Sequence, residues 1–360
     1  MNRPLIPKRH RSAVILSLIL LTAPILFDRF FLTAILTRSL ILGLVAASVV
    51  FLYRYMGVLS LAQIGIFAFA GFAYGNFVAS GDTNGLNLGW SPWVAAVAAI
   101  AVASVLSLVL GLLASRSADI YYMMTTLVFA VIVTYVFGQI APLSGFGGIS
   151  GLDTNLPWPL GTTADNPFRI YFATLICCAI AWWILARVVT SPFGLTIQGV
   201  RDDPVRMASL GFNVPLHRTV VFGFCGIFAA VSGVLFVWWN GHIDPTTAGL
   251  SATLDLVVIA VVGGLRHLSG AWVGALFFVG LDNIVRNIAP ISERFHTVVG
   301  IALLIVVIAS PDGLVGLWQK VRSRRAAHSP ATASSAAARN YAAHTPDGSS
   351  SEWLNPAEIN

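Results

Sequence analysis

The sequence predicts an all-α, polytopic membrane protein, and three observations support this prediction. Hydrophobic residues make up 57% of the 360 residues and charged residues only 10%, against roughly 25% charged residues in an ordinary soluble domain. Apolar runs long enough to cross a hydrocarbon core of about 30 Å recur along the chain. None of them alternates as barrel strands do, so the backbone inside lipid must satisfy its hydrogen bonds within helices.

The apolar runs predict about ten membrane spans. They cover residues 12–28, 32–53, 57–80, 92–115, 118–142, 168–189, 218–240, 251–265, 268–287 and 296–311. An even number of spans places both termini on one side of the membrane. If that side is cytoplasmic, sixteen of the 21 Lys and Arg residues lie inside, four lie outside and Arg38 lies within a span, as the positive-inside rule requires. Segment 251–265 is short enough to be a re-entrant or broken helix instead of a full span.

The two ends of the chain differ from the apolar segments between them. The basic N-terminus followed by residues 12–28 resembles a signal peptide, but no small-residue cleavage site follows, so we expect a first spanning helix. Residues 1–320 are expected to form the membrane domain. Residues 321–360 are rich in Ala, Ser, Thr and Pro without an apolar period, which predicts a disordered cytoplasmic tail.

Several function classes are excluded by residue types and spacing. The three cysteines lie in apolar runs without metal-ligand spacing, and the seven histidines are scattered, so we expect no metal site and no enzyme. The basic residues sit at the ends of apolar segments, which argues against nucleic acid. The only lysines, Lys8 and Lys320, do not follow a glycine-rich turn. The chain therefore has no phosphate-binding loop for ATP hydrolysis.

The connection after the sixth predicted span, residues 191–217, contains a short helix signal. Asp203 fits an N-cap, Pro204 the first helical position and Gly211 a C-terminal stop. We expect a helix of about two turns outside the bilayer. Such a helix either docks on a soluble partner or forms a solvated linker.

This connection resembles the coupling loop of LivM-type and LivH-type branched-chain amino acid permeases. Its matching residues are Gly199, Arg201, Asp202, Asp203, Ala208 and Gly211. Three further segments match the family in order, and they contain Gly57, Ser60, Leu61 and Gln63, then Gly147, Gly148, Gly151 and Leu152, then Gly263, Gly264, Gly270, Gly274 and Ala275. The resemblance covers about residues 40–315. Ala62, Phe146, Arg206 and Met207 depart from the usual pattern.

The resemblance implies a subunit of a binding-protein-dependent importer in the bacterial inner membrane. Its partners would be a second LivH-like permease subunit, two cytoplasmic ATP-binding subunits and an extracytoplasmic substrate-binding protein. ATP would be used by the partner subunits, with no cofactor in this chain, and the cargo would be Leu, Ile or Val. A urea or amide importer of the same family is an alternative. A second alternative is an ion-coupled secondary transporter, with Asp255 and Asp282 as cation sites.

Polar and glycine residues in the spans give candidates for the translocation pathway. Ser60 and Gln63 could line a broken helix or bond between helices, and Asp255 could face the pathway or cap a helix start. Gly263 and Gly264 complete this set. On the outer side, the long loop 143–167 with Gly147, Gly148 and Gly151 could dock the binding protein or simply connect two spans. Asp282 and Arg286, one helical turn apart, predict a local ion pair.

Overall fold

The computed structural model describes residues 31–78, 85–117, 119–152 and 167–287, with short pieces between 297 and 316. The chain divides into two units, Met1–Gly316 and Leu317–Asn360, and the predicted tail, 321–360, lies outside the described residues. Every regular element in the described part is a helix, and the β pairing found there is one isolated bridge, between Ile149 and Ile243. The all-α prediction is confirmed for this part of the chain.

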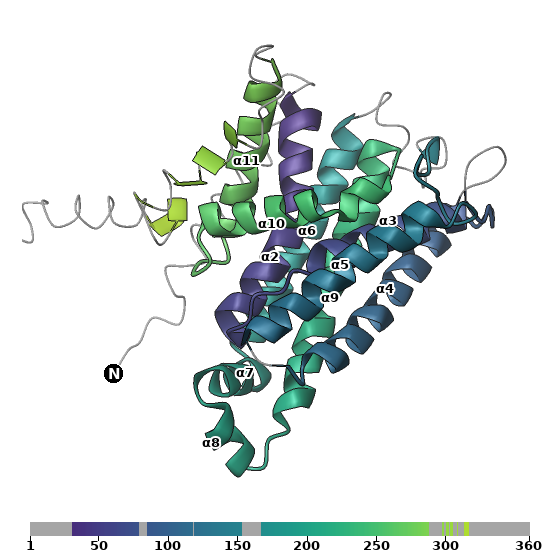
Figure 1. The fold of residues 1–360 in the computed structure, drawn as a ribbon. Helices are drawn as coiled ribbons and strands as arrows, with labels where there is room; N and C mark the ends of the chain where they lie inside the picture. Colours follow the sequence, from purple (N-terminus) through teal and green to yellow (C-terminus); the bar gives the residue numbers. More distant parts are fainter. Residues whose placement is uncertain are drawn as a thin grey trace, which may run out of the picture. The chain divides into compact units, whose positions relative to one another are not determined.

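Five helices are long and apolar enough to cross a membrane by length and composition. The first, Phe31–Met56, joins the π-helix η1 (Phe31–Thr37), α2 (Arg38–Phe51) and the π-helix η2 (Leu52–Met56). The others are α4 (Pro92–Ala114), α5 (Asp119–Gln139), α6 (Pro167–Val189) and α9 (Val214–Asn240), all labelled in Figure 1. They confirm helices at five of the predicted spans.

The remaining predicted spans have three different outcomes. Three correspond to shorter apolar helices, α3 (Gln63–Val78), α10 (Leu250–Gly263) and α11 (Gly270–Asn287). Segment 12–28 lies outside the described residues, and only isolated residues of 296–311 are described. The count of ten spans and the side of the termini therefore stay predictions.

The predicted helix start at residue 57 is wrong. Gly57 has a left-handed backbone, with φ of 78°, and its N–H bonds to the Tyr53 carbonyl at 3.1 Å, so the first span ends there as helices often end at glycine. The chain is not helical over the next residues, and α3 begins only at Gln63. Residues 57–62 form an irregular segment within an otherwise apolar stretch, which fits the broken-helix alternative.

Helix α10 is also short. Its 14 residues extend about 21 Å at 1.5 Å per residue, less than the roughly 30 Å of a hydrocarbon core. It ends at Gly264, whose φ is 109°, and the chain turns back into α11. This geometry favours the re-entrant or broken alternative over a full span.

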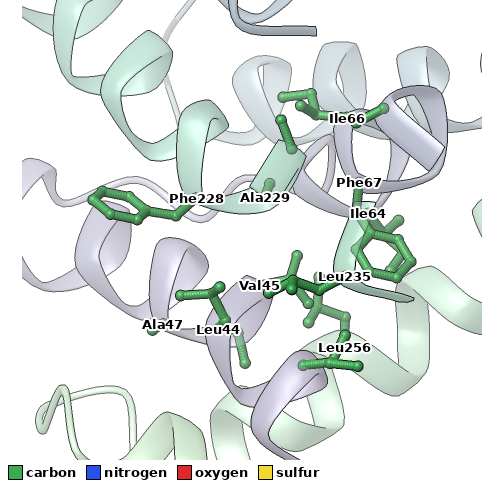
Figure 2. Packing of buried hydrophobic residues seen from close by; sticks show 14 of the residues in the cluster. Leu44, Val45, Ala47, Ile64, Ile66, Phe67, Phe228, Ala229, Leu235 and Leu256 are labelled. Carbon is green, nitrogen blue, oxygen red and sulfur yellow. The ribbon is translucent and has the colours of Figure 1, made fainter. Parts of the chain in front are cut away.

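The first span and α9 form the interior of the bundle. About 83% of the apolar window of Phe31–Met56 and 72% of that of α9 are buried, against 28% for α4, α5 and α6. Helix α9 packs against α2, α3 and α4. Figure 2 shows the centre of this core, where labelled side chains of four helices gather: Val45 of α2, Phe67 of α3, Leu235 of α9 and Leu256 of α10.

Small residues and buried hydroxyls bring these helices close. A Cβ atom at Gly233 of α9 would overlap the Phe67 carbonyl of α3, so only glycine permits this approach. Ser232 donates a hydrogen bond to the Ile41 carbonyl of α2 at 2.6 Å. Such contacts are typical of helix packing in membranes, where small residues let backbones approach.

Two short helices, α7 (Pro192–Asp202) and α8 (Pro204–Ser209), connect α6 to α9. They lie together near the start of α9 in Figure 1. The single helix predicted in this connection is therefore corrected to two. The connection is also shorter than expected, because α9 already begins at Val214, where the Asn213 side chain accepts from the Leu216 N–H at 3.1 Å.

Candidate functional site

Helix α7 is built by a local cap that our sequence reasoning overlooked. The Ser191 side-chain oxygen accepts a hydrogen bond from the Gly194 N–H at 3.2 Å, and Pro192 takes the first helical position. Serine and proline here give the same start signal as Asp203 and Pro204. The buried side of α7 includes Ile197 and Val200, so this helix is anchored to the bundle.

Helix α8 has the predicted cap and stop. The Asp203 carboxylate accepts a hydrogen bond from the Arg206 N–H at 2.9 Å, and Pro204 follows it. Gly211, with φ of 88°, follows the helix end, where the Phe212 N–H bonds to the Met207 carbonyl at 3.1 Å. Beyond its two chain neighbours, no heavy atom of the described residues lies within 4 Å of a Cβ built at Gly211. Glycine is favoured there by its backbone conformation and not by space.

Asp203→Ala is expected to loosen α8 by about 1 kcal/mol, because it removes the side-chain cap of the helix. Faster hydrogen exchange of the α8 amides, measured by mass spectrometry, would report this loss. Asp202→Ala is the matched control, since the Asp202 carboxylate bonds to Arg201 at 2.6 Å and caps no helix. Equal exchange in the two variants would contradict a capping role for Asp203.

Helix α8 and its C-cap, Leu210, are exposed and carry both apolar and polar side chains. None of its six residues is buried, and Ala208 faces outward with Val205, which is 75% exposed, and Leu210, which is 65% exposed. Gly199 of α7 instead packs against α8, since a Cβ there would lie 3.0 Å from the Met207 sulfur. Val205 and Leu210 therefore expose apolar side chains at a helix that lies outside the bundle.

Arg201 ties α7 to the end of the first span. Its guanidinium donates to the Arg54 carbonyl and pairs with the Asp202 carboxylate at 2.6 Å. The Arg201 stem also covers Gly57, where a Cβ would lie 2.7 Å from the Arg201 Cγ. Arg201 therefore contacts the start of the irregular segment 57–62 directly.

That irregular segment carries buried polar groups. Ser60 and Gln63 are at most 1% exposed, and the Thr126 hydroxyl of α5 accepts from the Leu61 N–H at 3.2 Å. Ser48 of α2 donates to the Gln63 side-chain oxygen at 3.2 Å, while the Gln63 Nε2 has no hydrogen-bond partner among the described residues. An unsatisfied buried amide is costly, so this position is suited to a polar ligand group or a water molecule.

The other pathway candidates lie apart from this segment. Asp255 lies half-buried in the second turn of α10, whose N-cap is Gly249, so the capping alternative for Asp255 is wrong. A Cβ at Gly263 would overlap the Gly270 carbonyl. Close packing between α10 and α11 accounts for glycine at 263, and the φ of 109° accounts for it at Gly264.

The glycines of the loop after α5, predicted to lie on the outer side, are found at a backbone junction. Ile149 and Ile243 exchange hydrogen bonds of 2.8 and 3.0 Å, joining this loop to the chain after α9. Gly148 is buried, has φ of 70°, and leaves no room for a Cβ beside the Ile243 carbonyl, whereas Gly147 is exposed in the adjacent turn. Gly151 is exposed, with φ of 76°. Gly148 and Gly151 therefore supply left-handed backbone turns in this loop.

The structure gives Asp282 an ion-pair partner that the sequence did not predict, and the predicted pairing with Arg286 stays a prediction. Asp282, 1% exposed on α11, pairs with Arg38 of α2 at 2.5 Å. The Arg286 side chain lies outside the described part. The partner 244 positions away cannot be found by helical spacing.

The sequence profile described as branched-chain amino acid transport system, permease component, matches residues 31–308. This range is most of the chain. The chain belongs to this permease family.

The permease is similar to several curated proteins at low identity. It is 21% identical over 152 residues to the high-affinity branched-chain amino acid transport system permease protein LivM of Escherichia coli strain K12, covering 42% of this chain and 35% of the relative. It is 25% identical over 161 residues to the probable permease LivH of Methanocaldococcus jannaschii, covering 42% and 50%. The match to the autoinducer 2 import system permease protein LsrC of Escherichia coli O9:H4 is 26% identical over 239 residues, covering 62% and 65%.

The permease thus spans between about a third and two thirds of these relatives. No solved structure matches it. The family assignment is confirmed, and the relatives' names describe transport subunits rather than enzymes.

Proposed function

We propose that this permease is the membrane-spanning subunit of an ATP-driven, binding-protein-dependent importer. The observation that carries the proposal is the capped, outward-facing helix α8, which exposes Val205 and Leu210 beside the anchored helix α7. A transporter working alone has no need of such a helix, whereas a soluble partner supplies a groove for it. Family membership and relatives that are import-system permeases support the same conclusion.

The partners follow from this proposal. Two cytoplasmic ATP-binding subunits supply ATP hydrolysis, one of them taking α8, and a second permease subunit completes the pathway through the bacterial inner membrane. An extracytoplasmic binding protein delivers cargo at the outer loop, where Phe146 is exposed beside Gly147. No cofactor is assigned to this chain.

The contacts suggest a mechanical route between the ATPase and the pathway. Movement of α8 passes to α7 through the contact of Met207 with Gly199. Arg201 then transmits it to the Arg54 carbonyl and Gly57. The irregular segment that follows ends at Gln63, which a two-state rearrangement would move relative to α2 and α5.

In the pathway, Ser60 and Gln63 are the residues proposed to meet a polar group of the cargo. Gln63 is suited because its Nε2 is buried without a hydrogen-bond partner among the described residues, and a passing carboxylate or amide would satisfy it. Asp255 is proposed as a second polar contact on α10. Gly263 and Gly264 act on the pathway only through the packing and the turn of α10.

The cargo we propose is a branched-chain amino acid, Leu, Ile or Val, as the family description indicates. Autoinducer 2 is a second candidate, because the similarity to LsrC covers 62% of this chain against 42% for LivM. Urea or an amide remains the third. The ion-coupled alternative is less favoured, since Asp282 is already paired with Arg38.

Val205→Asp is expected to weaken association with the ATP-binding subunit at least tenfold, because a charge would enter an apolar interface. Co-purification of the partner with the variant measures this. Ser209→Ala on the same helix is the control, since the Ser209 hydroxyl bonds only to the Val205 carbonyl in the described structure. Unchanged co-purification of the Val205→Asp variant would exclude α8 as the docking helix.

Uptake into proteoliposomes carrying the assembled complex tests the whole proposal. ATP-dependent uptake of labelled leucine that is abolished by Gly211→Asp, while the complex still assembles, would support both the ATP-driven importer and the proposed cargo. ATP-dependent uptake of autoinducer 2 or urea alone would support the importer proposal and change the proposed cargo. Uptake driven by an ion gradient without any ATPase would overturn the importer.

A further inference from the structure

An arginine near the start of α9 has a buried nitrogen without a partner. Arg218 is half-buried, and its Nε atom makes no hydrogen bond with the described residues. None of the ion pairs found among those residues includes Arg218. Taking a guanidinium out of water without a counter-charge is costly. Folding alone therefore does not account for the position of this side chain.

The Arg218 guanidinium lies close to Tyr122 of α5. The Tyr122 side chain is buried, and its hydroxyl interacts electrostatically with Arg218 and faces Ser60. The hydroxyl does not reach normal hydrogen-bond geometry with any described residue. The Tyr122 ring packs edge-on against Phe222, one turn after Arg218, with the ring centroids 6.3 Å apart. Tyr122 therefore joins α9 to the irregular segment 57–62.

Further polar side chains lead from Tyr122 to Gln63. Thr126 lies one turn further along α5 and accepts a hydrogen bond from the Leu61 N–H at 3.2 Å. Gln63 begins α3, and its Nε2 is buried without a hydrogen-bond partner among the described residues. We call Arg218, Tyr122, Ser60 and Gln63 the polar row. Each end of the row carries an N–H donor that no acceptor in the described part of the chain satisfies.

Three simpler explanations account for only part of the polar row. The positive-inside rule explains an arginine at the end of a span but not a buried Nε beside Tyr122. A water molecule could satisfy Gln63, but water does not neutralise a guanidinium. A carboxylate of an ATP-binding subunit could reach the exposed part of Arg218. It could not reach Tyr122 or Gln63, which are 1% and 0% exposed.

We propose that the polar row binds the carboxylate of the cargo as the cargo leaves the pathway near α7 and α8. Guanidinium N–H groups match a carboxylate in geometry and charge, and the Tyr122 hydroxyl can donate a further hydrogen bond. Ionisable side chains inside a membrane bundle are typical of substrate paths. Because the row is buried, the cargo reaches it only when the irregular segment 57–62 moves.

This inference rests on the importer proposed above and narrows its cargo to amino acids or other carboxylates. Urea has no carboxylate, so it would leave the charge of Arg218 unpaired. A site built to bond one group of its ligand discriminates strongly against molecules that lack the group. Arg218 and Tyr122 would therefore favour an amino acid over urea.

The test measures carboxylate binding by the full-length permease in detergent. Thermal unfolding is followed with increasing leucine and, in parallel, with leucinamide, in which a neutral amide replaces the carboxylate. Arg218→Gln removes the charge, and Arg218→Lys keeps it. Arg116→Gln is the matched control, because Arg116 is exposed in the turn after α4. It lies on the same side of the bundle, since the neighbouring Ser115 accepts a hydrogen bond from Thr219 at 3.1 Å.

Leucine is expected to raise the melting temperature and leucinamide is not, because only leucine offers a negative charge to Arg218. Arg218→Gln should weaken the apparent affinity for leucine about tenfold or more, since hydrogen bonds to charged groups are among the strongest. Arg218→Lys should recover part of that affinity, and Arg116→Gln should behave as the wild type does. A structural role alone would not separate leucine from leucinamide.

Three results would overturn the proposal. The first is no stabilisation by leucine, or equal stabilisation by leucine and leucinamide. The second is an equal response of the wild type and Arg218→Gln to leucine. The third is loss of the ATP-binding subunit from Arg218→Gln in co-purification with leucine binding unchanged, because Arg218 would then pair with that subunit.

The binding measurement needs neither ATP nor a partner subunit, so it is separate from the test of the importer. Leucine binding that depends on Arg218, without ATP-dependent uptake of any cargo, would overturn the importer and support the polar row as a carboxylate site. ATP-dependent leucine uptake that Arg218→Gln leaves unchanged would support the importer and overturn the role of the row in transport.

Discussion

Replacing Gly274 with alanine is expected to destabilise the permease strongly, whereas Gly280→Ala in the same helix is not. A Cβ at Gly274 would overlap the Ile259 carbonyl and lie 2.8 Å from the Gly263 nitrogen. Both atoms belong to the backbone of α10 and cannot rotate away, so α10 and α11 would have to separate. Overpacking of this kind typically costs about 1–3 kcal/mol, and it would also disturb the turn that carries Arg266.

Thermal unfolding of the two variants in detergent measures the difference. Apart from the backbone of its own helix, no heavy atom of the described residues lies within 4 Å of a Cβ built at Gly280, and alanine is preferred over glycine in a helix by about 1 kcal/mol. Gly280→Ala should therefore leave the melting temperature unchanged or raise it. Equal melting temperatures for the two variants would show that the backbone contact between α10 and α11 does not limit stability.

Local signals in the sequence predicted the cap and the stop of α8 in the connection between α6 and α9. The cap at Asp203 and the stop at Gly211 each act within four residues, so the pattern alone predicts them. The same rule applied to Ser191 would have found α7. The long spans could also be predicted from the sequence, because the length of an apolar run decides whether it can cross a membrane.

Tertiary packing decided the features that sequence reasoning missed. Hydropathy continues through residues 57–62, yet the helix is interrupted there, with Ser60 and Gln63 buried and the Leu61 N–H bonded to Thr126 of α5. The role of Gly263 was also not visible from spacing, because its constraint is the backbone of Gly270 across a turn. Contacts between separate helices leave no signal in hydropathy or in residue spacing along the sequence.

Loss of the ion pair between Arg38 and Asp282 is the second large effect that we expect. Arg38→Met would remove the guanidinium that lies 2.5 Å from the Asp282 carboxylate, which is 1% exposed. Removing one member of a buried pair costs roughly 3–5 kcal/mol, whereas replacing both by apolar residues is often neutral. Because the Arg38 side chain is 30% exposed, we expect a cost near the lower end of that range.

The double variant Arg38→Met with Asp282→Leu should recover most of the stability lost in Arg38→Met. Unfolding of the single and double variants under the same conditions gives the coupling between the two side chains, and additive losses would contradict a structural ion pair. Transport by the folded double variant tests whether Asp282 only supports helix packing or also binds a coupling cation. An importer driven by ATP should retain uptake, because the carboxylate only supports the packing of α2 and α11. An ion-coupled transporter that loads its cation on Asp282 would lose uptake completely even though the protein remains folded.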